Sequence, residues 1–448
     1  MNKKRAALLI LIALLAFGWY KLFYKTYSVK YIPANVDAII TIDKKRVINT
    51  LLWQFITTPS QWKFSSSDSK KDSTISWKKV IELPDYITAF HITTQPNNAW
   101  HTCLPIKNHV KITYFLQQQG FKNISGNEFV HEGNNLFATI KEGMLVISSI
   151  ATADKNLQTS VIESLFTTKK TITEAQFKKL TTAKSHVAGL FLQNNFLQED
   201  AIVKANFDKQ KIEILTTLLP KQQFIFTENN FTFSSSSLLN FQFSQPNAAT
   251  YNLLDNITKE KISKALNFNA DSFFLPSNKT YQLQADKFIN RVDSAISYTY
   301  DDEFNKIEKV VVNNVQEPVY NFTVTGDSVN NIYNNWQKNK LLETTPQGNL
   351  FTPIPFVKSY ATVSGNQLIV QPYNYKATSS NANFKGIAYM QLNIADVPAN
   401  LLNYLPDEFK KGIANLQNLV ITAEQKEKTV EVKVVVGKKK NDLPIIKL

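Results

Sequence analysis

The longest apolar stretch of the chain lies at its start. A basic segment, residues 3–5, precedes an uninterrupted apolar run from Ala6 to Tyr20. A helix over residues 6–24 would rise about 28 Å, which is close to the thickness of the hydrocarbon core of a bilayer. The run lacks the polar face of an amphipathic core helix. The pattern therefore predicts a transmembrane signal-anchor helix over 6–24, with residues 1–5 in the cytoplasm.

A cleaved signal peptide is the alternative for the same segment. Ala16-Phe17-Gly18 has the small-x-small pattern of a cleavage site, and cleavage near Gly18 would release a secreted protein. With a retained anchor, a large domain that follows the helix is ordinarily translocated. The single Cys103 cannot form an internal disulfide, which suits a bacterial envelope better than a eukaryotic cell surface. We therefore expect the bulk of the chain in the bacterial periplasm.

Beyond residue 24 the pattern changes to short alternating runs of apolar and polar residues, and parts of it occur twice. The run 137–140, followed by a Gly-containing turn and 143–147, predicts a hairpin that recurs at 360–363 and 366–370. Three other similarities follow the same chain order: 35–40 with 269–274, the helix starts at Asn108 and Asp327, and 187–192 with 387–392. This shared order predicts an internal duplication.

These patterns predict an α+β fold. We expect an N-terminal transmembrane helix followed by two tandem, related units of antiparallel sheet with helices packed on one face. The first unit would span 25–245 and the second 246–448. Helical patterns occupy 44–56, 156–166, 174–182 and 406–415, and the polar segment 65–76 predicts an exposed loop.

The charge of the chain adds little about its partners. The formal net charge is +14, but the basic residues are dispersed, and no Arg-rich stripe alternates with aromatic residues as in a nucleic-acid groove. A solvated basic surface is the better interpretation, and no nucleic acid is expected as a partner. Only 12 glycines occur in 448 residues, which argues against a Gly-rich phosphate-binding loop.

No common catalytic motif occurs in the sequence. The signatures of zinc proteases, serine hydrolases and nucleotide-binding proteins are all absent. The most suggestive group is His91, His101, Cys103 and His109, since imidazole and thiol groups are ligands for zinc and copper. Their spacing does not match a zinc knuckle, and no second pair of ligands follows. We therefore favour ordinary packing or exposure for these four residues.

The adjacent carboxylates Asp301, Asp302 and Glu303 are the second candidate group. They could serve as an acid/base pair or bind Ca²⁺, but no calcium-loop pattern surrounds them. They lie between two runs rich in β-forming residues, which favours a solvated hairpin tip. The sequence therefore assigns no catalytic residue, no cofactor and no metal site.

The turn Ile32-Pro33-Ala34-Asn35-Val36-Asp37-Ala38, the anchor and the repeated pattern together resemble a known group of proteins. These are uncharacterised, membrane-anchored bacterial envelope proteins with a duplicated domain of unknown function. The resemblance covers the plan of the whole chain. It implies an extracytoplasmic location and brings no catalytic residues.

Three functions follow as expectations. The first is a non-enzymatic, membrane-anchored scaffold or binding protein of the bacterial envelope. It would contact the bilayer through residues 6–24 and hold another envelope protein or an apolar ligand on its sheet surfaces or between its two copies. The second is a membrane-tethered protein that binds or transfers lipid or another apolar ligand. The third is an envelope hydrolase, which needs a cleft where His91, His101 or the carboxylates 301–303 meet other polar groups.

Overall fold

The computed structural model describes residues 20–439 of the chain except 21, 58–74, 151–153, 209, 223–225, 246–250, 252–255, 267–268, 270, 272–273, 275–278, 301–302, 355–356, 374, 376–379, 400–412 and 414. The chain divides into two compact units at Leu219 and Pro220. Each unit is described by itself below. The strands at 229–245, which the sequence analysis placed in the first unit, pair with strands of unit 2.

Ten strands of unit 1 form an antiparallel ladder in the order β4-β5-β6-β7-β3-β2-β1-β8-β9-β10. The strands are short, and most of them are rich in β-branched or aromatic residues, as is typical of sheets. The bounds are β1 Val36–Asp43, β2 Tyr86–Ile92, β3 Trp100–Pro105, β4 Lys122–Ser125, β5 Glu128–His131, β6 Leu136–Lys141, β7 Met144–Ser148, β8 Val187–Phe191, β9 Ala201–Phe207 and β10 Lys211–Leu218.

Helical segments connect these strands in unit 1. They are α2 Lys44–Thr57, η2 Trp77–Lys79, α3 Ile112–Gln118, η3 Glu132–Asn134, α4 Lys155–Glu163, η5 Ser164–Thr168 and α5 Glu174–Thr182. Helices α2 and α5 form where the sequence predicts them. Thr173 and Gln176 make a capping box at the start of α5, with each side chain bonded to the backbone of the other.

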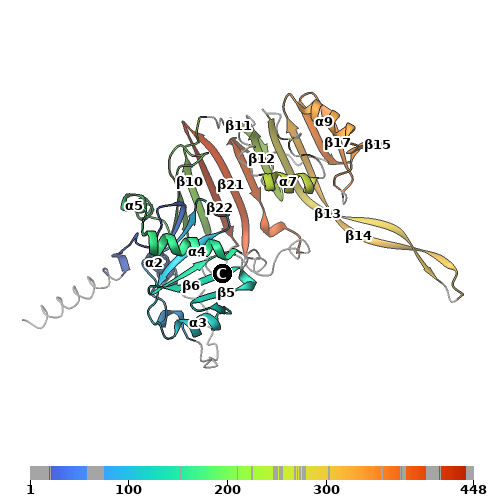
Figure 1. The fold of residues 1–448 in the computed structure, drawn as a ribbon. Coiled ribbons are helices and arrows are strands. Elements are labelled where there is room, and N and C mark those ends of the chain that lie inside the picture. Colours follow the sequence, from blue (N-terminus) through green and yellow to red (C-terminus); the bar gives the residue numbers. More distant parts are fainter. Residues whose placement is uncertain are drawn as a thin grey trace, which may run out of the picture. The chain divides into compact units, whose positions relative to one another are not determined.

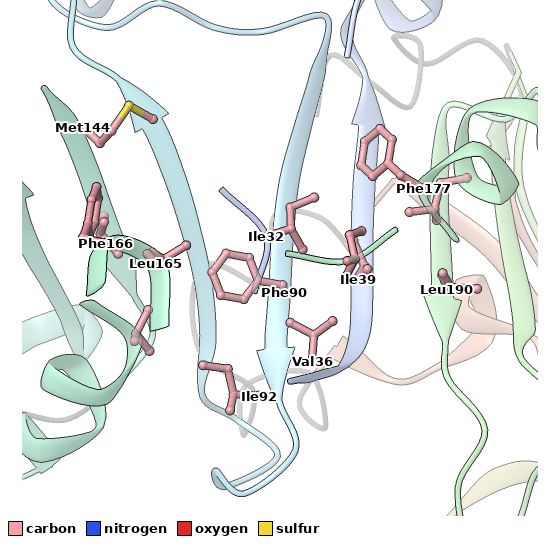
Figure 2. Packing of buried hydrophobic residues seen from close by; sticks show 14 of the residues in the cluster. Ile32, Val36, Ile39, Phe90, Ile92, Met144, Leu165, Phe166, Phe177 and Leu190 are labelled. Atoms are coloured by element: carbon pink, nitrogen blue, oxygen red, sulfur yellow. The ribbon is translucent and has the colours of Figure 1, made fainter. Parts of the chain in front are cut away.

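One face of the unit 1 sheet is covered by α4, η5 and α5. Ile39 of β1, Phe90 of β2 and Leu190 of β8 lie at the centre of this core, together with Leu165 and Phe177 from the helices (Figure 2). The three strand residues are almost fully buried. Burial of a large apolar side chain stabilises the fold by roughly 1.5–3 kcal/mol. This face is therefore a closed core.

The opposite face of the same sheet carries a second core under α3. Ile112 and Leu116 of α3 pack on Phe129 of β5 and on Leu145 of β7. Val146, the next residue of β7, points into the first core. Successive side chains of a strand point to opposite faces, so β7 is apolar on both sides and needs a cover on both.

Ten strands of unit 2 follow one another in the ladder order β15-β16-β17-β18-β14-β13-β12-β20-β21-β22. Two further strands, β11 and β19, pair only with each other in the described residues. The bounds are β11 Asn229–Phe233, β12 Leu239–Gln245, β13 Lys279–Tyr300, β14 Lys306–Thr325, β15 Leu342–Thr345, β16 Gly348–Phe351, β17 Ser359–Ser364, β18 Gln367–Pro372, β19 Ala382–Gly386, β20 Ala388–Leu392, β21 Leu416–Lys426 and β22 Thr429–Lys438, with helices α7 Asn256–Leu266, α9 Val329–Lys338 and η6 Ile394–Asp396.

The two units share one strand order. Reading along each ladder, β4 to β7 correspond to β15 to β18, β3-β2-β1 to β14-β13-β12, and β8-β9-β10 to β20-β21-β22. In chain order, helix α2 lies between β1 and β2 of unit 1, and α7 lies between the corresponding strands β12 and β13 of unit 2. Helix α3 corresponds to α9. A common origin of the units stays a prediction.

The same order revises one pair of similar segments. The segment 35–40 forms the start of β1, whose counterpart in the ladder is β12, and not the segment 269–274. Of that segment, residues 270, 272 and 273 lie outside the described residues.

The core under α9 repeats the arrangement found under α3. Val329, Ile332 and Trp336 of α9 pack against Val324 of β14 and Leu368 of β18. Trp336 contacts the ring of Phe351, with a distance of 4.5 Å between ring centroids. In both units, therefore, one short helix covers the strands at the same end of the ladder.

Strands β13 and β14 continue past the rest of unit 2 as a two-stranded ribbon (Figure 1). Strand β12 pairs with β13 only as far as Ala285, and β18 pairs with β14 only from Phe322 onward. Between these points and the turn, the described strands pair only with each other. A register shift between Ala285 and Lys287 marks the place where β13 leaves the sheet.

The predicted fold class is wrong in two respects. The structure is mainly antiparallel sheet, with 48% of the described residues in strands against 23% in helices. Helices cover both faces of the unit 1 sheet rather than one face, because β7 is apolar on both sides. No helix within the described ranges is both long and apolar enough to cross a bilayer.

Several predicted segments lie outside the described residues. These are residues 6–19 and 21 of the anchor helix, residues 65–74 of the polar loop, and most of the helix at 406–415.

Candidate apolar ligand site

A row of five apolar side chains crosses the sheet of unit 2. Leu239 of β12 lies directly opposite Ala285 of β13 on one side and Leu392 of β20 on the other. Leu392 in turn lies opposite Leu419 of β21, which lies opposite Val436 of β22. Directly opposed residues of antiparallel strands point to the same face. The register therefore collects these five side chains, from positions far apart in sequence, into one row.

This row forms part of the wall of a cavity of about 570 Å³. The volume falls within the range of about 300–1,000 Å³ that is common for small-molecule sites. Every described lining residue is apolar. Besides the row, these residues are Leu238, Phe288, Ile394, Val397, Ile413 and Leu416.

The other face of the same strands is polar, which explains the direction of the apolar row. Asn240 of β12 donates a hydrogen bond to the carbonyl oxygen of Ser234 at 2.9 Å. Gln391 of β20 donates to the carbonyl oxygen of Ser235 at 3.0 Å. These amides are buried and their bonds reach the segment that follows β11. Side chains alternate between the two faces of a strand. Leu239 and Leu392 are the sequence neighbours of these two amide residues, so they point to the opposite face.

A second, polar cavity of about 410 Å³ adjoins the apolar one. Leu238 and Phe288 line both cavities, so the two spaces meet at these side chains. The remaining walls of the polar cavity supply hydroxyl, amide, carboxylate and ammonium groups. They come from Ser236, Asp286, Lys287, Asn290, Gln316 and Asp396, with Pro398.

Asp286 is the bulged residue at the boundary of the two cavities. Its carboxylate accepts hydrogen bonds from the hydroxyl of Ser237 at 2.6 Å, the amide of Gln284 at 2.8 Å and the hydroxyl of Tyr375 at 3.2 Å. Burial, and then the negative charge of Asp286, raises the pKa of Tyr375, so this phenol stays protonated and donates. Asp286 is therefore held in place.

The four His and Cys positions singled out from the sequence do not form one site. Phe90 pairs with His101 and His91 pairs with Trp100 across β2 and β3. His91 and His101 therefore point to opposite faces of the sheet. His91 bonds Asp37 at 2.6 Å, and His101 lies 2.7 Å from the hydroxyl of Ser148. Each imidazole therefore bonds its own neighbour, and the two rings do not share a ligand site.

His101 and Cys103 are both shifted toward their neutral forms. Burial, with a smaller contribution from the charge of His91, lowers the pKa of His101 to about 4. Burial raises the pKa of Cys103 to about 12, so this thiol is not a thiolate at neutral pH. Cys103 packs against the core under α4 and α5, and His109 lies beside the turn at Gly143.

The acidic positions 301–303 are only partly described. Asp301 and Asp302 lie outside the described residues, and Glu303 is exposed in the turn between β13 and β14. In the part of the chain that the structure describes, no group of three or more His, Cys, Asp or Glu side chains is placed to hold a metal ion.

The apolar row is not among the residues that the sequence singles out. Its local signal is the alternation of apolar residues in the segments 239–243, 388–392 and 430–434, while 419–421 is a continuous apolar run. Alternation predicts a strand with one apolar face, but it does not say which strands are neighbours or which residues are opposed. Those pairings join residues up to about 150 positions apart and come only from the fold.

No protein-family model and no curated protein matches this chain. Among solved structures, the chain is similar to one described as the structure of crystal form I of TP0453. The alignment has a TM-score of 0.21 and 8% sequence identity, and it covers 80% of this chain and 94% of the other. A similarity at this TM-score supports no assignment of fold or function.

Proposed function

We propose that this protein is a membrane-tethered, extracytoplasmic binding protein for a single-chain amphiphile, which it holds in unit 2. The observation that carries the proposal is the pair of adjoining cavities, one lined by apolar residues alone and one by polar groups. Such an arrangement matches a ligand with one apolar tail and one polar head. The tail would lie over the row from Ala285 to Val436, and the head beside Asp286 and Lys287.

The apolar cavity favours a long chain over a short one. Each methylene moved out of water contributes about 0.8 kcal/mol, so a tail of about ten methylenes gains about 8 kcal/mol. Association itself costs at least about 4 kcal/mol of lost freedom. A tail of about five methylenes would barely offset this cost. We therefore expect affinity to rise with chain length until the cavity is full.

The polar cavity favours a head group that carries hydrogen-bonding groups and little net negative charge. Among the described lining residues, Lys287 is the one cation, while Asp286 and Asp396 contribute two carboxylates. The carboxylate of Asp286 already accepts three hydrogen bonds and needs no further donor. A neutral or zwitterionic head would therefore bind better than a free phosphate or carboxylate.

The membrane tether rests on the sequence. The apolar run from Ala6 to Tyr20 with its basic start supports an anchor, and a tether would keep the binding site near a source of amphiphiles. The scaffold hypothesis stays a prediction. The hydrolase hypothesis is less well supported, because His91 and His101 point to opposite faces of the sheet.

The test is a titration of detergent-purified, full-length protein with a fluorescent acyl-chain probe. Val436→Phe would fill the end of the row far from the polar cavity without adding polarity, and we expect at least a tenfold loss of affinity for a long-chain probe. Ala395→Phe, in η6 but outside the described lining, is the matched control and should bind as the wild type does.

Chain length separates a filled cavity from a misfolded unit. If Val436→Phe only fills the far end of the cavity, the variant should retain affinity for a shorter probe while losing affinity for the longer one. Equal binding of the long probe by the wild type and Val436→Phe would overturn the proposal. So would a wild-type protein that shows no saturable binding of any chain length.

A further inference from the structure

Helix α2 carries an apolar stripe that no described part of unit 1 covers. Ile48, Leu52, Trp53 and Ile56 are 48%, 44%, 67% and 58% exposed. Successive members of this group are four, one and three positions apart, which places all four on one side of the helix. Single exposed apolar residues are ordinary on protein surfaces, but four on one helix side, with a tryptophan among them, indicate a binding surface.

The other side of α2 faces the protein. Gln54 is buried. The hydroxyl of Thr50 lies 2.6 Å from Nε2 of His186, the residue just before β8. Thr50 and Gln54 are each two positions from a residue of the stripe, which is about 200° around the helix. Ile48, Leu52 and Ile56 therefore point away from Thr50 and Gln54. Trp53, three positions from Thr50, lies at the edge of the stripe, beside a cavity that it shares with Thr50 and Gln54.

The last described residues of the predicted anchor, Tyr20 and Leu22 to Tyr24, lie along α2. The side-chain amide of Asn49 donates to the carbonyl oxygen of Leu22 at 3.1 Å, and Lys45 donates to the carbonyl oxygen of Tyr24. The Tyr20 and Tyr24 rings stack with centroids 4.7 Å apart. If the predicted anchor spans a bilayer, its C-terminal end at residues 20–24 would bring the bilayer surface close to α2.

Basic residues accompany the stripe. Lys25, Lys44, Lys45 and Arg46 lie at the first turn of α2 or beside it. Among the described residues they form ion pairs with two carboxylates, Asp43 and Asp85, and Asp208 lines the same cavity as Lys25 and Arg46, so the cations are in excess by one charge. A Lys or Arg near an anionic bilayer surface contributes about 1 kcal/mol of binding. The first turn of α2 therefore has charge complementarity to anionic lipid.

A cavity opens beside the stripe on the same side as these cations. It has a volume of about 550 Å³ and is lined by Phe23, Trp53, Lys25 and Arg46, among others. Aromatic residues at its rim and cations on its wall match the boundary between acyl chains and anionic head groups. A lipid head group is the chemistry that this cavity fits.

We infer that α2 lies on the surface of an anionic bilayer, with Ile48, Leu52, Trp53 and Ile56 inserted below the head groups. This is a second membrane contact in addition to the predicted anchor. It orients unit 1 on the membrane, which a flexible tether alone would not do. It does not depend on the amphiphile site of unit 2.

Tryptophan quenching tests the insertion directly. Full-length protein is reconstituted into phosphatidylcholine vesicles, with or without phosphatidylglycerol, that contain lipid brominated on its acyl chains. Trp53→Phe should remove a large part of the quenched fluorescence, and the loss should be greater with phosphatidylglycerol. Trp77→Phe is the matched control, since Trp77 is also exposed in unit 1 but lies outside α2. That control should leave the quenched part unchanged.

A charge variant adds an independent readout. Lys44→Glu combined with Lys45→Glu should weaken the quenching of Trp53 on anionic vesicles and leave it unchanged on neutral ones. Equal quenching in the wild type and Trp53→Phe would overturn the inference. So would a Trp53 emission shift that depends on protein concentration without vesicles, since that would show a second copy on the stripe. Probe binding in unit 2 should be unchanged in every variant.

Discussion

Unit 1 and unit 2 have the same strand order but fill it differently. In unit 1 the segment between β7 and β8 forms α4, η5 and α5, and these helices close an apolar core over Ile39 and Leu190. In unit 2 the described segment between β18 and β20 forms β19, which pairs with β11 beside a layer of buried amides. The apolar row then lies on the opposite face and lines a cavity.

Comparing the two units distinguishes the interactions that stabilise the shared strand ladder from the features that form a ligand cavity. Backbone hydrogen bonds and the short helix at one end, α3 or α9, are common to both units. In unit 1 helices fill the remaining space and close the core, while in unit 2 the described residues leave the apolar row lining a cavity. Three measurements test this comparison.

The largest expected difference is between two leucines in corresponding strands. Leu190→Ala in β8 should lower the free energy of unfolding of unit 1 by about 2–5 kcal/mol, because it creates a new cavity in a closed core. Leu392→Ala in β20 should cost unit 2 about 1 kcal/mol, because this side chain already borders a cavity. Hydrogen–deuterium exchange of peptides from β8 and β20 measures both. Equal losses would mean that the unit 2 cavity is closed.

The next effect is acid sensitivity of unit 1. Burial holds the pKa of His101 at about 4, below its ordinary value of 6.5, so the folded state binds fewer protons than the unfolded state between these values. Stability should therefore fall as the pH falls from 6.5 toward 4, by up to about 3 kcal/mol. His101→Gln should remove this part of the pH dependence, measured by urea unfolding across that range. An unchanged pH profile would show that His101 titrates normally.

The corresponding strand of unit 2 offers a control for this effect. At the equivalent part of β14 the chain has Tyr320 and Phe322, and neither titrates in the acid range. Peptides of β14 should therefore keep their exchange protection over the same pH interval in which peptides of β3 lose it.

The smallest effect concerns two helix starts. Thr173→Ala removes the side chain that caps α5 in unit 1, and should cost about 1 kcal/mol. Ser328, at the start of α9 in unit 2, makes no capping bond, and its buried hydroxyl has no hydrogen-bond partner in the described residues. Ser328→Ala should therefore leave stability unchanged or raise it slightly. Thermal unfolding of both variants provides the measurement, and a larger loss for Ser328→Ala would contradict the structure.

Local features of the fold were predictable from the sequence, whereas pairings between distant segments were not. Helix α5 and the hairpins β6–β7 and β17–β18 are encoded by adjacent residues, by a capping box in one case and by Gly-containing turns in the others. The opposed positions of Leu239 and Leu392 depend on the register of β12 and β20, which no local pattern gives.

The unknown strand pairing also explains why the sequence suggested a metal site at these His and Cys residues. His91, His101 and Cys103 are near one another in sequence, and His101 and Cys103 alternate on one strand. Only the pairing of β2 with β3 shows that His91 points to the other face.

The ribbon of β13 and β14 gives unit 2 a long reach. Its free part extends about 45 Å, at about 3.3 Å per residue. Both of its outer edges present backbone N–H and C=O groups to water, and Val292, Ile296 and Val310 on it are more than 60% exposed. An incoming extended peptide could align along either margin without disturbing a single bond of the parent sheet. At high protein concentration, copies of this chain should therefore associate first through the β13–β14 ribbon, which lies outside the packed core of unit 2.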